Sequence, residues 1–165
     1  MNDKIQTTWL LIVALGICFC IGFILLTRHL IRQYRRSRRA GMIDEMEGHD
    51  FEYFCAELLE KRGFMDVEVT RGSGDYGVDI LAEKEGVTYA IQCKRYSAPV
   101  GVEAVQQIYA GRDYYDRMVG AVITNQYFTA AAVEAAKRLK ILLWDRGYLD
   151  SMIEEGEKNS FERMS

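Results

Sequence analysis

The sequence predicts an α/β protein with a mixed β-sheet flanked by helices, preceded by one transmembrane helix. Three observations support this prediction. An 18-residue stretch at 9–26 carries no charged side chain. Between residues 78 and 94, two short strand-like segments meet at a glycine turn. After them, up to residue 153, short apolar runs alternate with segments whose apolar residues recur at helical spacing. The chain of 165 residues therefore accommodates one domain and one appendage.

The apolar stretch extends to residue 31 and predicts a membrane-spanning helix over 9–31. Eighteen residues of helix rise about 27 Å, close to the hydrocarbon thickness of a bilayer. A cleaved signal peptide would have a shorter apolar region followed by small residues, whereas Thr27 and Arg28 follow here. A buried core helix would show a polar face, which this stretch lacks. We therefore expect a retained single-pass anchor.

Charge is divided unevenly along the chain. Residues 1–39 carry seven Lys and Arg and one Asp, a net charge of +6, and six arginines follow the apolar stretch. The positive-inside rule then predicts that the N-terminus lies outside the cell membrane and that the rest of the chain is cytoplasmic. Residues 40–165 carry 14 Lys and Arg against 23 Asp and Glu, a net charge of −9. This acidity disfavours tight non-specific binding to a phosphate backbone.

Composition and periodicity divide the chain into five segments. These are an N-terminal tail at 1–8, the apolar helix at 9–31, a basic connector at 32–46, a folded domain at 47–153 and a polar tail at 154–165. The tail is expected to fray. The four cysteines contain no Cys-x-x-Cys pair, so we expect neither structural zinc nor a disulfide framework.

The folded domain begins with a helix that Asp50 is expected to cap. Phe51, Cys55 and Leu59 recur along it at helical spacing and form its buried stripe, and Gly63 is suited to end it. Residues 64–70 then read as a strand. Two further strands form a hairpin over 78–94, described next.

The hairpin gathers polar side chains. Glu85-Gly86 supplies its tight turn, so that Asp79 faces Gln92. Lys94 then lies diagonally beside Asp79 and on the same face of the strands. A carboxylate, an amide oxygen and an ammonium group converge at one place, as a hydrolytic metal site requires.

After the hairpin, Ser97-Ala98-Pro99 ends the strand, and helical spacing follows from Val102 to Gly111 or Tyr115. Apolar runs and a capping Thr129 then predict the remaining elements. These are a buried strand over 118–124, a helix over 129–139, a buried strand over 141–144 and a short helix over 148–153. The order is helix, three strands, helix, strand, helix, strand, helix, which predicts a mixed sheet with helices on both faces.

Asp79 and the side-chain oxygen of Gln92 are ligands of the kind that Mg²⁺ prefers. Lys94 can orient or help to deprotonate a water and stabilise a phosphate during transfer. Glu52 is a candidate for the outer shell of this site, and Asp75 is a candidate second acid or an ordinary turn residue. The implied reaction is attack of a metal-activated water on a phosphodiester. The alternative to a catalytic site is a solvent-exposed polar cluster across the two strands. Each side-chain pair of such a cluster would contribute only roughly 0.2–1 kcal/mol to the stability of the fold.

Gly72, Gly74 and Gly77 match the spacing of a dinucleotide-binding fingerprint. That fingerprint requires a helix to begin at the glycines, whereas a strand follows them here, so we interpret the segment as a loop that leads to Asp79. Three arginines are candidate contacts to DNA phosphates. The alternative is that each is an ordinary surface arginine. They are Arg71, Arg95 and Arg112.

Gly-Ser-Gly-Asp-Tyr-Gly-Val-Asp at 72–79, followed by Ile-Gln-Cys-Lys at 91–94, resembles the catalytic domain of Mrr-type restriction endonucleases. These belong to the PD-(D/E)xK nuclease superfamily, in a variant where glutamine replaces the second acid. The resemblance covers roughly residues 46–150. It implies the restriction-endonuclease-like fold and Mg²⁺-dependent DNA cleavage, with Mn²⁺ as a substitute metal. It also implies Asp79, Gln92 and Lys94 as catalytic residues, with Glu52 as a supporting acid.

The expected function is that of a membrane-anchored endonuclease that acts on double-stranded DNA from the cytoplasmic side. The resembling family often recognises modified DNA through a separate DNA-binding domain, and a membrane span is expected in that place here. Cutting both DNA strands commonly needs two active sites. A homodimer is therefore one possible assembly of the protein. The alternative is an inactive module with the nuclease fold that binds DNA or a protein partner at the membrane.

Overall fold

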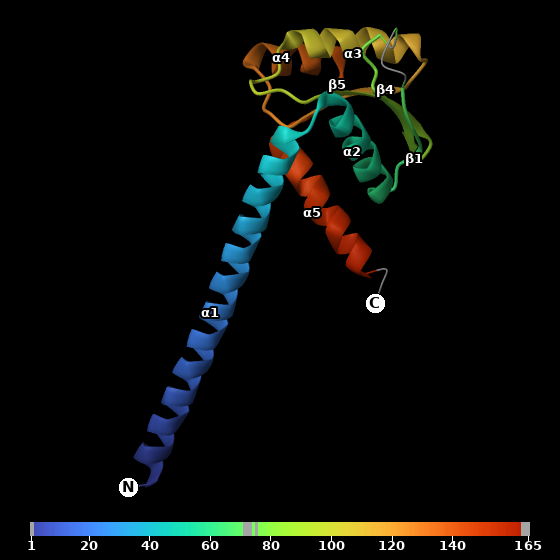
Figure 1. Ribbon diagram of the computed structural model, residues 1–165. Coiled ribbons are helices and arrows are strands. Elements are labelled where there is room, and N and C mark those ends of the chain that lie inside the picture. The colour runs from blue at the N-terminus through green and yellow to red at the C-terminus, as the bar shows by residue number, and fades with distance from the viewer. Residues whose placement is uncertain (1, 71–73, 75, 163–165) are drawn as a thin grey trace. The chain divides into compact units, whose positions relative to one another are not determined.

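A computed structural model describes residues 2–70, 74 and 76–162 of the chain (Figure 1). Within the terminal helices, the side chains at 1–15, 32, 35, 36, 39, 40 and 157–162 lie outside that description. The chain divides into two compact units, Met1–Gly41 and Met42–Ser165.

The first unit is helical throughout its described length. Helix α1 runs from Asn2 to Glu45, so the predicted connector at 32–46 continues the helix instead of interrupting it. Arginine is a good helix former, and the connector contains no proline that would stop the helix. Over the described residues we find no helix with the length and apolar character needed to cross a bilayer. The prediction at 9–31 begins with side chains, at 9–15, that lie outside the description.

The second unit is built on a five-stranded sheet in which the spatial order of the strands follows the chain. Its strands are β1 (Met65–Val69), β2 (Ile80–Lys84), β3 (Val87–Lys94), β4 (Val119–Thr124) and β5 (Ile141–Trp144). The pairings β1–β2 and β2–β3 are antiparallel, whereas β3–β4 and β4–β5 are parallel. The predicted order of elements and the mixed sheet are therefore confirmed.

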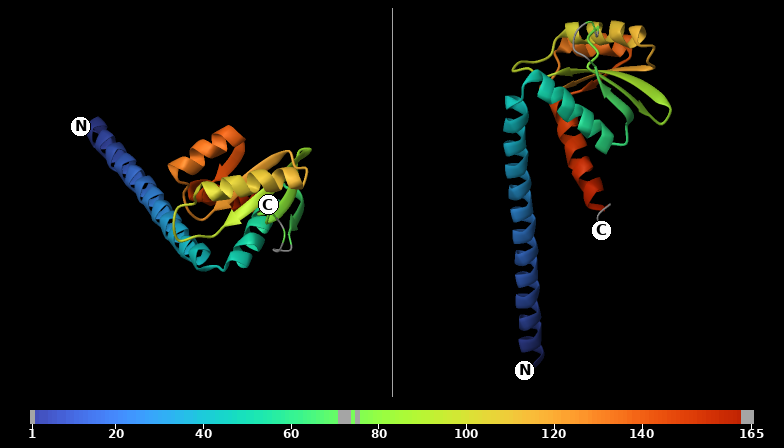
Figure 2. Two further views of the ribbon diagram at one scale, coloured as in Figure 1. Left: turned by 90° about the horizontal axis from the view of Figure 1, so that it is seen from above. Right: turned by 45° about the vertical axis from the view of Figure 1, so that its right-hand side comes forward.

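Helices cover both faces of this sheet (Figure 1). On one face lie α2 (Gly48–Lys61) and the first half of α5 (Arg146–Glu162), and on the other lie α3 (Val102–Tyr114) and α4 (Ala130–Leu139). Seen from above, α3 and α4 lie side by side over the strands (Figure 2). Because side chains alternate along a strand, Ile91 of β3 joins the core beneath α2 while Ala90 joins the core beneath α3.

Two helix ends confirm the prediction and one corrects it. Thr129 caps α4, where its side chain accepts a hydrogen bond from the Ala132 amide, and Gly63 follows α2 with a φ of +81°. The cap of α2 is different: Glu47 occupies that position without a side-chain cap bond, and Asp50 lies in the first turn. An acid there still interacts favourably with the positive end of the helix dipole.

The C-terminal segment corrects a further prediction. Helix α5 begins at Arg146 and continues to Glu162, so the segment 154–165 is not a frayed tail over its described part. The segment contains four glutamates and one lysine, which favour helix about as well as leucine does. One glycine, Gly156, lowers helix propensity without ending the helix.

The β2–β3 hairpin has the predicted register. Glu85 and Gly86 both have positive φ, 54° and 78°, as a two-residue type I′ turn requires. The strands pair from Lys84 with Val87 up to Ile80 with Ile91. The Asp79 amide continues the ladder by donating to the Ile91 carbonyl at 2.9 Å. Asp79 therefore lies across from Gln92.

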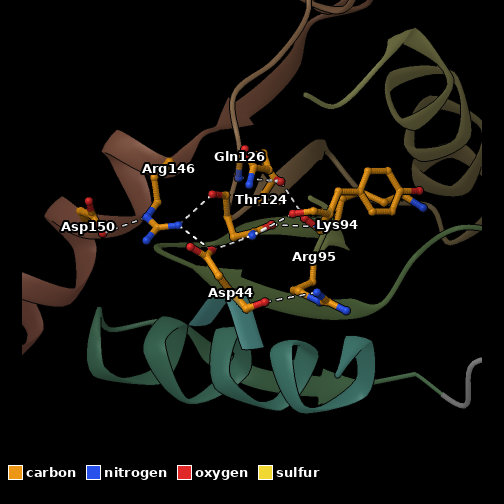
Figure 3. A network of polar contacts seen from close by, with 9 residues as sticks. Asp44, Lys94, Arg95, Thr124, Gln126, Arg146 and Asp150 are labelled. Carbon is orange, nitrogen blue, oxygen red and sulfur yellow. Dashed lines mark hydrogen bonds and ion pairs between the residues drawn. The ribbon is translucent and has the colours of Figure 1, made fainter. Parts of the chain in front are cut away.

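A polar network holds the chain that follows β3 (Figure 3). Buried Asn125, after β4, accepts a hydrogen bond from the Tyr96 amide and donates one to the Tyr96 carbonyl, both at 2.9 Å. The Thr124 hydroxyl donates to the Lys94 carbonyl at 2.6 Å. The backbone on both sides of Arg95 is thus fixed from the end of β4.

The same network reaches two helix ends (Figure 3). The Asp44 carboxylate, at the end of α1 within the second unit, accepts hydrogen bonds at 2.8 Å from the Asn125 amide and from Arg146 Nη1. Arg146 also donates to the Asn125 carbonyl at 2.9 Å, and its Nε lies 3.4 Å from an Asp150 oxygen. Residues far apart in the sequence therefore fix the segment after Lys94.

Helix α3 approaches the segment before Asp79 very closely. A Cβ at buried Gly111 would lie 2.5 Å from Val78 Cγ2 and 2.8 Å from the Tyr76 carbonyl oxygen. On the β1 side, the Thr70 hydroxyl donates to the Val78 carbonyl at 2.6 Å, and the Thr70 amide donates to the Asp79 carbonyl at 2.9 Å. The backbone that leads to Asp79 is therefore clamped between α3 and the end of β1.

We expect Gly111→Ala to destabilise the domain, because its methyl group would collide with backbone as well as with a side chain. Overpacking of this kind lowers the free energy of unfolding by about 1–3 kcal/mol. Urea denaturation of the full chain would measure it. Gly48→Ala is the matched control, since a Cβ at this helical glycine would meet nothing within 4 Å apart from its chain neighbours and its own helix backbone. Equal unfolding midpoints for the two variants would contradict the expectation.

Candidate active site

A pocket of about 520 Å³ lies between the hairpin and α3. Its lining consists of Tyr76, Gly77, Asp79, Gln92, Lys94, Gln107 and Ala110. The three hairpin side chains predicted to be catalytic thus share one pocket. Their convergence follows from the register, since Asp79 faces Gln92 and Lys94 lies two residues further along the same face.

The Asp79 carboxylate is held by the strand that it faces. Its Oδ2 accepts a hydrogen bond from the backbone amide of Cys93 at 2.6 Å. Cys93 stands between Gln92 and Lys94, so this bond ties the carboxylate to the centre of the Gln-Cys-Lys segment. Hydrogen bonds to an ionised acceptor are among the stronger ones in proteins. The position of Asp79 relative to its two partners is therefore well determined.

Gln92 is buried, with 1% of its surface exposed. Its Nε2 donates to Gln107 Oε1 at 2.9 Å, while its own Oε1 has no hydrogen-bond partner in the described part of the chain. A buried polar atom left unpaired lowers the stability of the fold by about 1–3 kcal/mol. A bound water or cation would remove this penalty at the Gln92 oxygen. Gln107 was not predicted, and the only signal for it was its place on the helix that follows the hairpin.

Gly77 makes room for this amide pair. Its φ is +75°, and a Cβ there would lie 2.7 Å from Gln92 Nε2 and 3.1 Å from Gln107 Cβ. Glycine is therefore required both by the backbone conformation and by the close approach. Among the described residues of the glycine segment, 74, 76 and 77 lie in no helix, and the next regular element is strand β2. Residues 71–73 and 75, on which the rest of the loop interpretation falls, lie outside the described residues.

The ammonium group of Lys94 lies 5.9 Å from the ring centroid of Tyr96, at the outer limit of a cation–π interaction. Among the described residues, no carboxylate forms an ion pair with it. An ammonium that is not committed to a structural ion pair can interact with a bound anion.

Glu52 lies on α2 and is not among the residues that line the pocket. Its Oε2 lies 2.9 Å from His49 Nδ1, one turn earlier in the same helix. Loss of water around the Cys93 thiol raises its pKa well above the ordinary value, and Cys55, Asp79 and Glu52 raise that pKa further. Cys93 is therefore a neutral thiol at neutral pH, and both Glu52 and Asp79 act electrostatically on that thiol of β3.

The two described arginines among the predicted phosphate contacts have partners within the chain. Arg95 Nη1 donates to the Asp44 carbonyl at 3.3 Å. Arg112 bonds the Asp113 carboxylate at 2.7 Å and lies 4.8 Å from the Tyr109 ring centroid. A role of either arginine in DNA binding stays a prediction. Arg71 and Asp75 lie outside the described residues.

Within the described ranges, no group of three or more His, Cys, Asp and Glu residues could hold a metal ion. A site formed by Asp79 and Gln92 would instead combine one carboxylate with one neutral amide oxygen. The unpaired Gln92 Oε1 fits such a role, because Mg²⁺ accepts carboxylate and amide oxygens and retains several waters.

Comparison with solved structures shows the fold. The protein of unknown function AF1548 has a TM-score of 0.50 at 23% identity, over 59% of this chain and 59% of that chain. The DNA modification-dependent restriction endonuclease AspBHI has a TM-score of 0.56 at 16% identity, over 74% of this chain and 35% of that chain. The MspJI restriction endonuclease, in complex with a 27-mer oligonucleotide, has a TM-score of 0.50 at 18% identity, over 73% and 30%.

This chain therefore spans 59%, 35% and 30% of those three proteins. The likeness confirms the restriction-endonuclease-like core. No curated protein matches the sequence. The restriction endonuclease family Mrr_cat matches residues 43–153, which include all five strands and every described residue of the pocket. The chain belongs to the Mrr_cat restriction endonuclease family.

Proposed function

We propose that this protein is a metal-dependent DNA endonuclease whose site is the pocket of Asp79, Gln92 and Lys94. The observation that carries the proposal is the convergence of three chemically different groups on one pocket, one of which, the buried amide oxygen of Gln92, has no described partner. Membership of a restriction endonuclease family supports hydrolysis of DNA.

Asp79 and Gln92 Oε1 would hold Mg²⁺, for which Mn²⁺ would substitute. A bound divalent ion supplies an activated water and neutralises charge that develops on the phosphate. The chain prepares both ligands: the Cys93 amide fixes the Asp79 carboxylate, and Gln107 accepts from the Gln92 amide nitrogen, which leaves the amide oxygen for a cation.

Lys94 is proposed to stabilise the negative charge on the phosphate while water attacks phosphorus and the bond to the leaving oxygen breaks. Its backbone carbonyl is held by Thr124 and the following segment by Asn125, so the start of the lysine side chain is fixed. Glu52 is proposed as a supporting acid that acts from α2. His49 then orients its carboxylate through the bond between the two side chains.

A second candidate is a module with the nuclease fold that binds DNA or a protein without cutting. The net charge of −9 over residues 40–165 favours the form that binds a protein, because an acidic domain repels a phosphate backbone. Two results together would favour this second candidate. The Lys94→Ala variant would still bind DNA or the partner, and the unaltered chain would not cleave DNA.

The unaltered chain, purified in mild detergent, is expected to cleave plasmid DNA with Mg²⁺ or Mn²⁺ and to stop when EDTA removes the metal. Asp79→Ala and Lys94→Ala should each lower the cleavage rate about 100-fold or more, because each removes a group that acts on the reacting phosphate. Gel electrophoresis of nicked and linear products would measure the rates.

Lys84→Ala is the matched control for Lys94→Ala. Lys84 is also a hairpin lysine that lies over an aromatic ring, 5.0 Å from the Phe64 centroid, but it donates to the Arg62 carbonyl away from the pocket. The Lys84→Ala variant should cleave plasmid DNA at close to the rate of the unaltered chain. Equal cleavage by all three alanine variants, or no cleavage by the unaltered chain, would refute the proposal.

Gln92→Leu is expected to weaken Mn²⁺ binding about tenfold or more, because it removes an oxygen ligand while filling the same space. Gln92→Glu should bind Mn²⁺ at least as well as the unaltered chain, since a carboxylate replaces the amide oxygen. Electron paramagnetic resonance of free Mn²⁺ would measure the affinities. Gln106→Leu, which alters an exposed neighbour on α3, is the control. A single affinity for all four proteins would exclude Gln92 as a ligand.

Residues 9–31 are proposed to anchor the protein in the cell membrane, with the N-terminus outside and the nuclease domain in the cytoplasm. Support comes from the uncharged apolar stretch at 9–26 and from large exposed side chains on α1, among them Phe19 and Phe23. The arginines at 28–39 support the orientation.

The unaltered chain is expected to stay in the membrane fraction through alkaline extraction. A variant with Phe19→Asp and Phe23→Asp should move largely to the supernatant, because charged groups in the bilayer interior are costly. Immunoblotting of the two fractions would measure the distribution. Release of the unaltered chain by the alkaline wash would argue against the anchor.

A further inference from the structure

Two tyrosines stack on each other beside the candidate active site. The ring centroids of Tyr76 and Tyr114 lie 3.9 Å apart, with 30° between the ring planes. Tyr76 also lines the pocket that contains Asp79 and Lys94. Both tyrosines nevertheless remain accessible, with 55% and 60% of their surfaces exposed. The pair therefore offers aromatic surface to a ligand next to the pocket.

The backbone holds this pair in place before any ligand arrives. Tyr76 has a φ of +53°, a left-handed conformation that is unusual for an aromatic residue. Gly111 lets the Tyr76 carbonyl come against α3, where a Cβ would meet that oxygen at 2.8 Å. Tyr115 contacts the Tyr114 ring edge-on at a centroid distance of 5.1 Å. A ring fixed in this way loses little conformational freedom on binding.

The charge of the domain indicates what such a surface would bind. Residues 40–165 carry a net charge of −9, so contacts to a phosphate backbone contribute little attraction over most of the surface. Arg95 and Arg112 already bond to Asp44 and Asp113. Stacking of bases on aromatic rings does not depend on net charge and tolerates any base sequence. A DNA ligand would therefore gain affinity here through an exposed base face.

We propose that Tyr76, supported by Tyr114, stacks on an unpaired base next to the phosphate that is cut. The preferred substrate is then DNA with an unpaired nucleotide at the site, since a paired base does not present its face. This inference rests on the proposed nuclease function and specifies its substrate. The competing description is that the tyrosine pair only attaches the segment before Asp79 to α3.

The test measures binding of the full chain, in detergent and with Ca²⁺ in place of Mg²⁺, to an oligonucleotide that contains 2-aminopurine. The single strand is compared with the same strand in a fully paired duplex. We expect quenching of the fluorescent base and tighter binding of the single strand. Tyr76→Leu should weaken single-strand binding about tenfold, reduce the quenching and leave duplex affinity unchanged. Tyr76→Phe should retain both properties of the unaltered chain.

Tyr53→Leu is the matched control, because Tyr53 lies on α2 and is 53% exposed, nearly as much as Tyr76. It should bind both oligonucleotides as the unaltered chain does. Tyr114→Leu serves as a second variant should Tyr76→Leu lower the melting temperature, since it removes the supporting ring from the surface of α3. It is expected to weaken single-strand binding in the same direction.

Equal affinity of the unaltered chain for single strand and duplex, or no loss of affinity in either tyrosine variant, would overturn the inference. Plasmid cleavage that continues in that case would leave the proposed nuclease function standing. If quenching depends on Tyr76 but the unaltered chain does not cleave DNA, the stacking of a base on Tyr76 would stand. The proposed nuclease function would then be refuted.

Discussion

The antiparallel pairing of β2 with β3 determines where every polar group of the candidate site lies. The Glu85-Gly86 turn, with two positive φ angles, sets a register in which Asp79 faces Gln92. A slip by one residue would turn Gln92 and Lys94 toward α2 and bring Cys93 toward α3, because side chains alternate along a strand. Burial of Ile91 and Ala90 in two different cores resists such a slip.

The pocket combines a buried unpaired acceptor with left-handed backbone conformations. Gln92 keeps a buried oxygen without a described partner, and Tyr76 and Gly77 both adopt positive φ angles. A domain selected for stability alone would gain from an apolar side chain in place of Gln92. Single features of this kind also occur elsewhere in the described chain, as at Lys140, which has a positive φ, and at Arg117, whose buried Nε is unpaired. What distinguishes the pocket is that the unpaired oxygen shares its lining with a carboxylate and an ammonium group. This combination of groups supports the assignment of the pocket independently of the family match.

Contacts from distant segments keep the two strands of the candidate site in position. Gly111 and Thr70 clamp the segment before Asp79, whereas Asn125 and Thr124 hold the chain at and after Lys94. The clamps engage backbone atoms, so they fix where each side chain begins and leave its end available to a substrate. Catalysis by positioned charges depends on such support, since small displacements of a catalytic group lower rates strongly.

The hairpin, its turn, the order of elements and the Thr129 cap could be derived from sequence because each depends on residues close together in the chain. Helix ends were less predictable: α1 and α5 continue beyond the expected limits because their residues are compatible with helix on both sides of the boundary. Gln107, Gly111 and the Asp44–Asn125–Arg146 network emerged only from the tertiary structure. Asp44 and Arg146 are 102 positions apart, and no local pattern encodes a hydrogen bond between residues that only the folded sheet brings together.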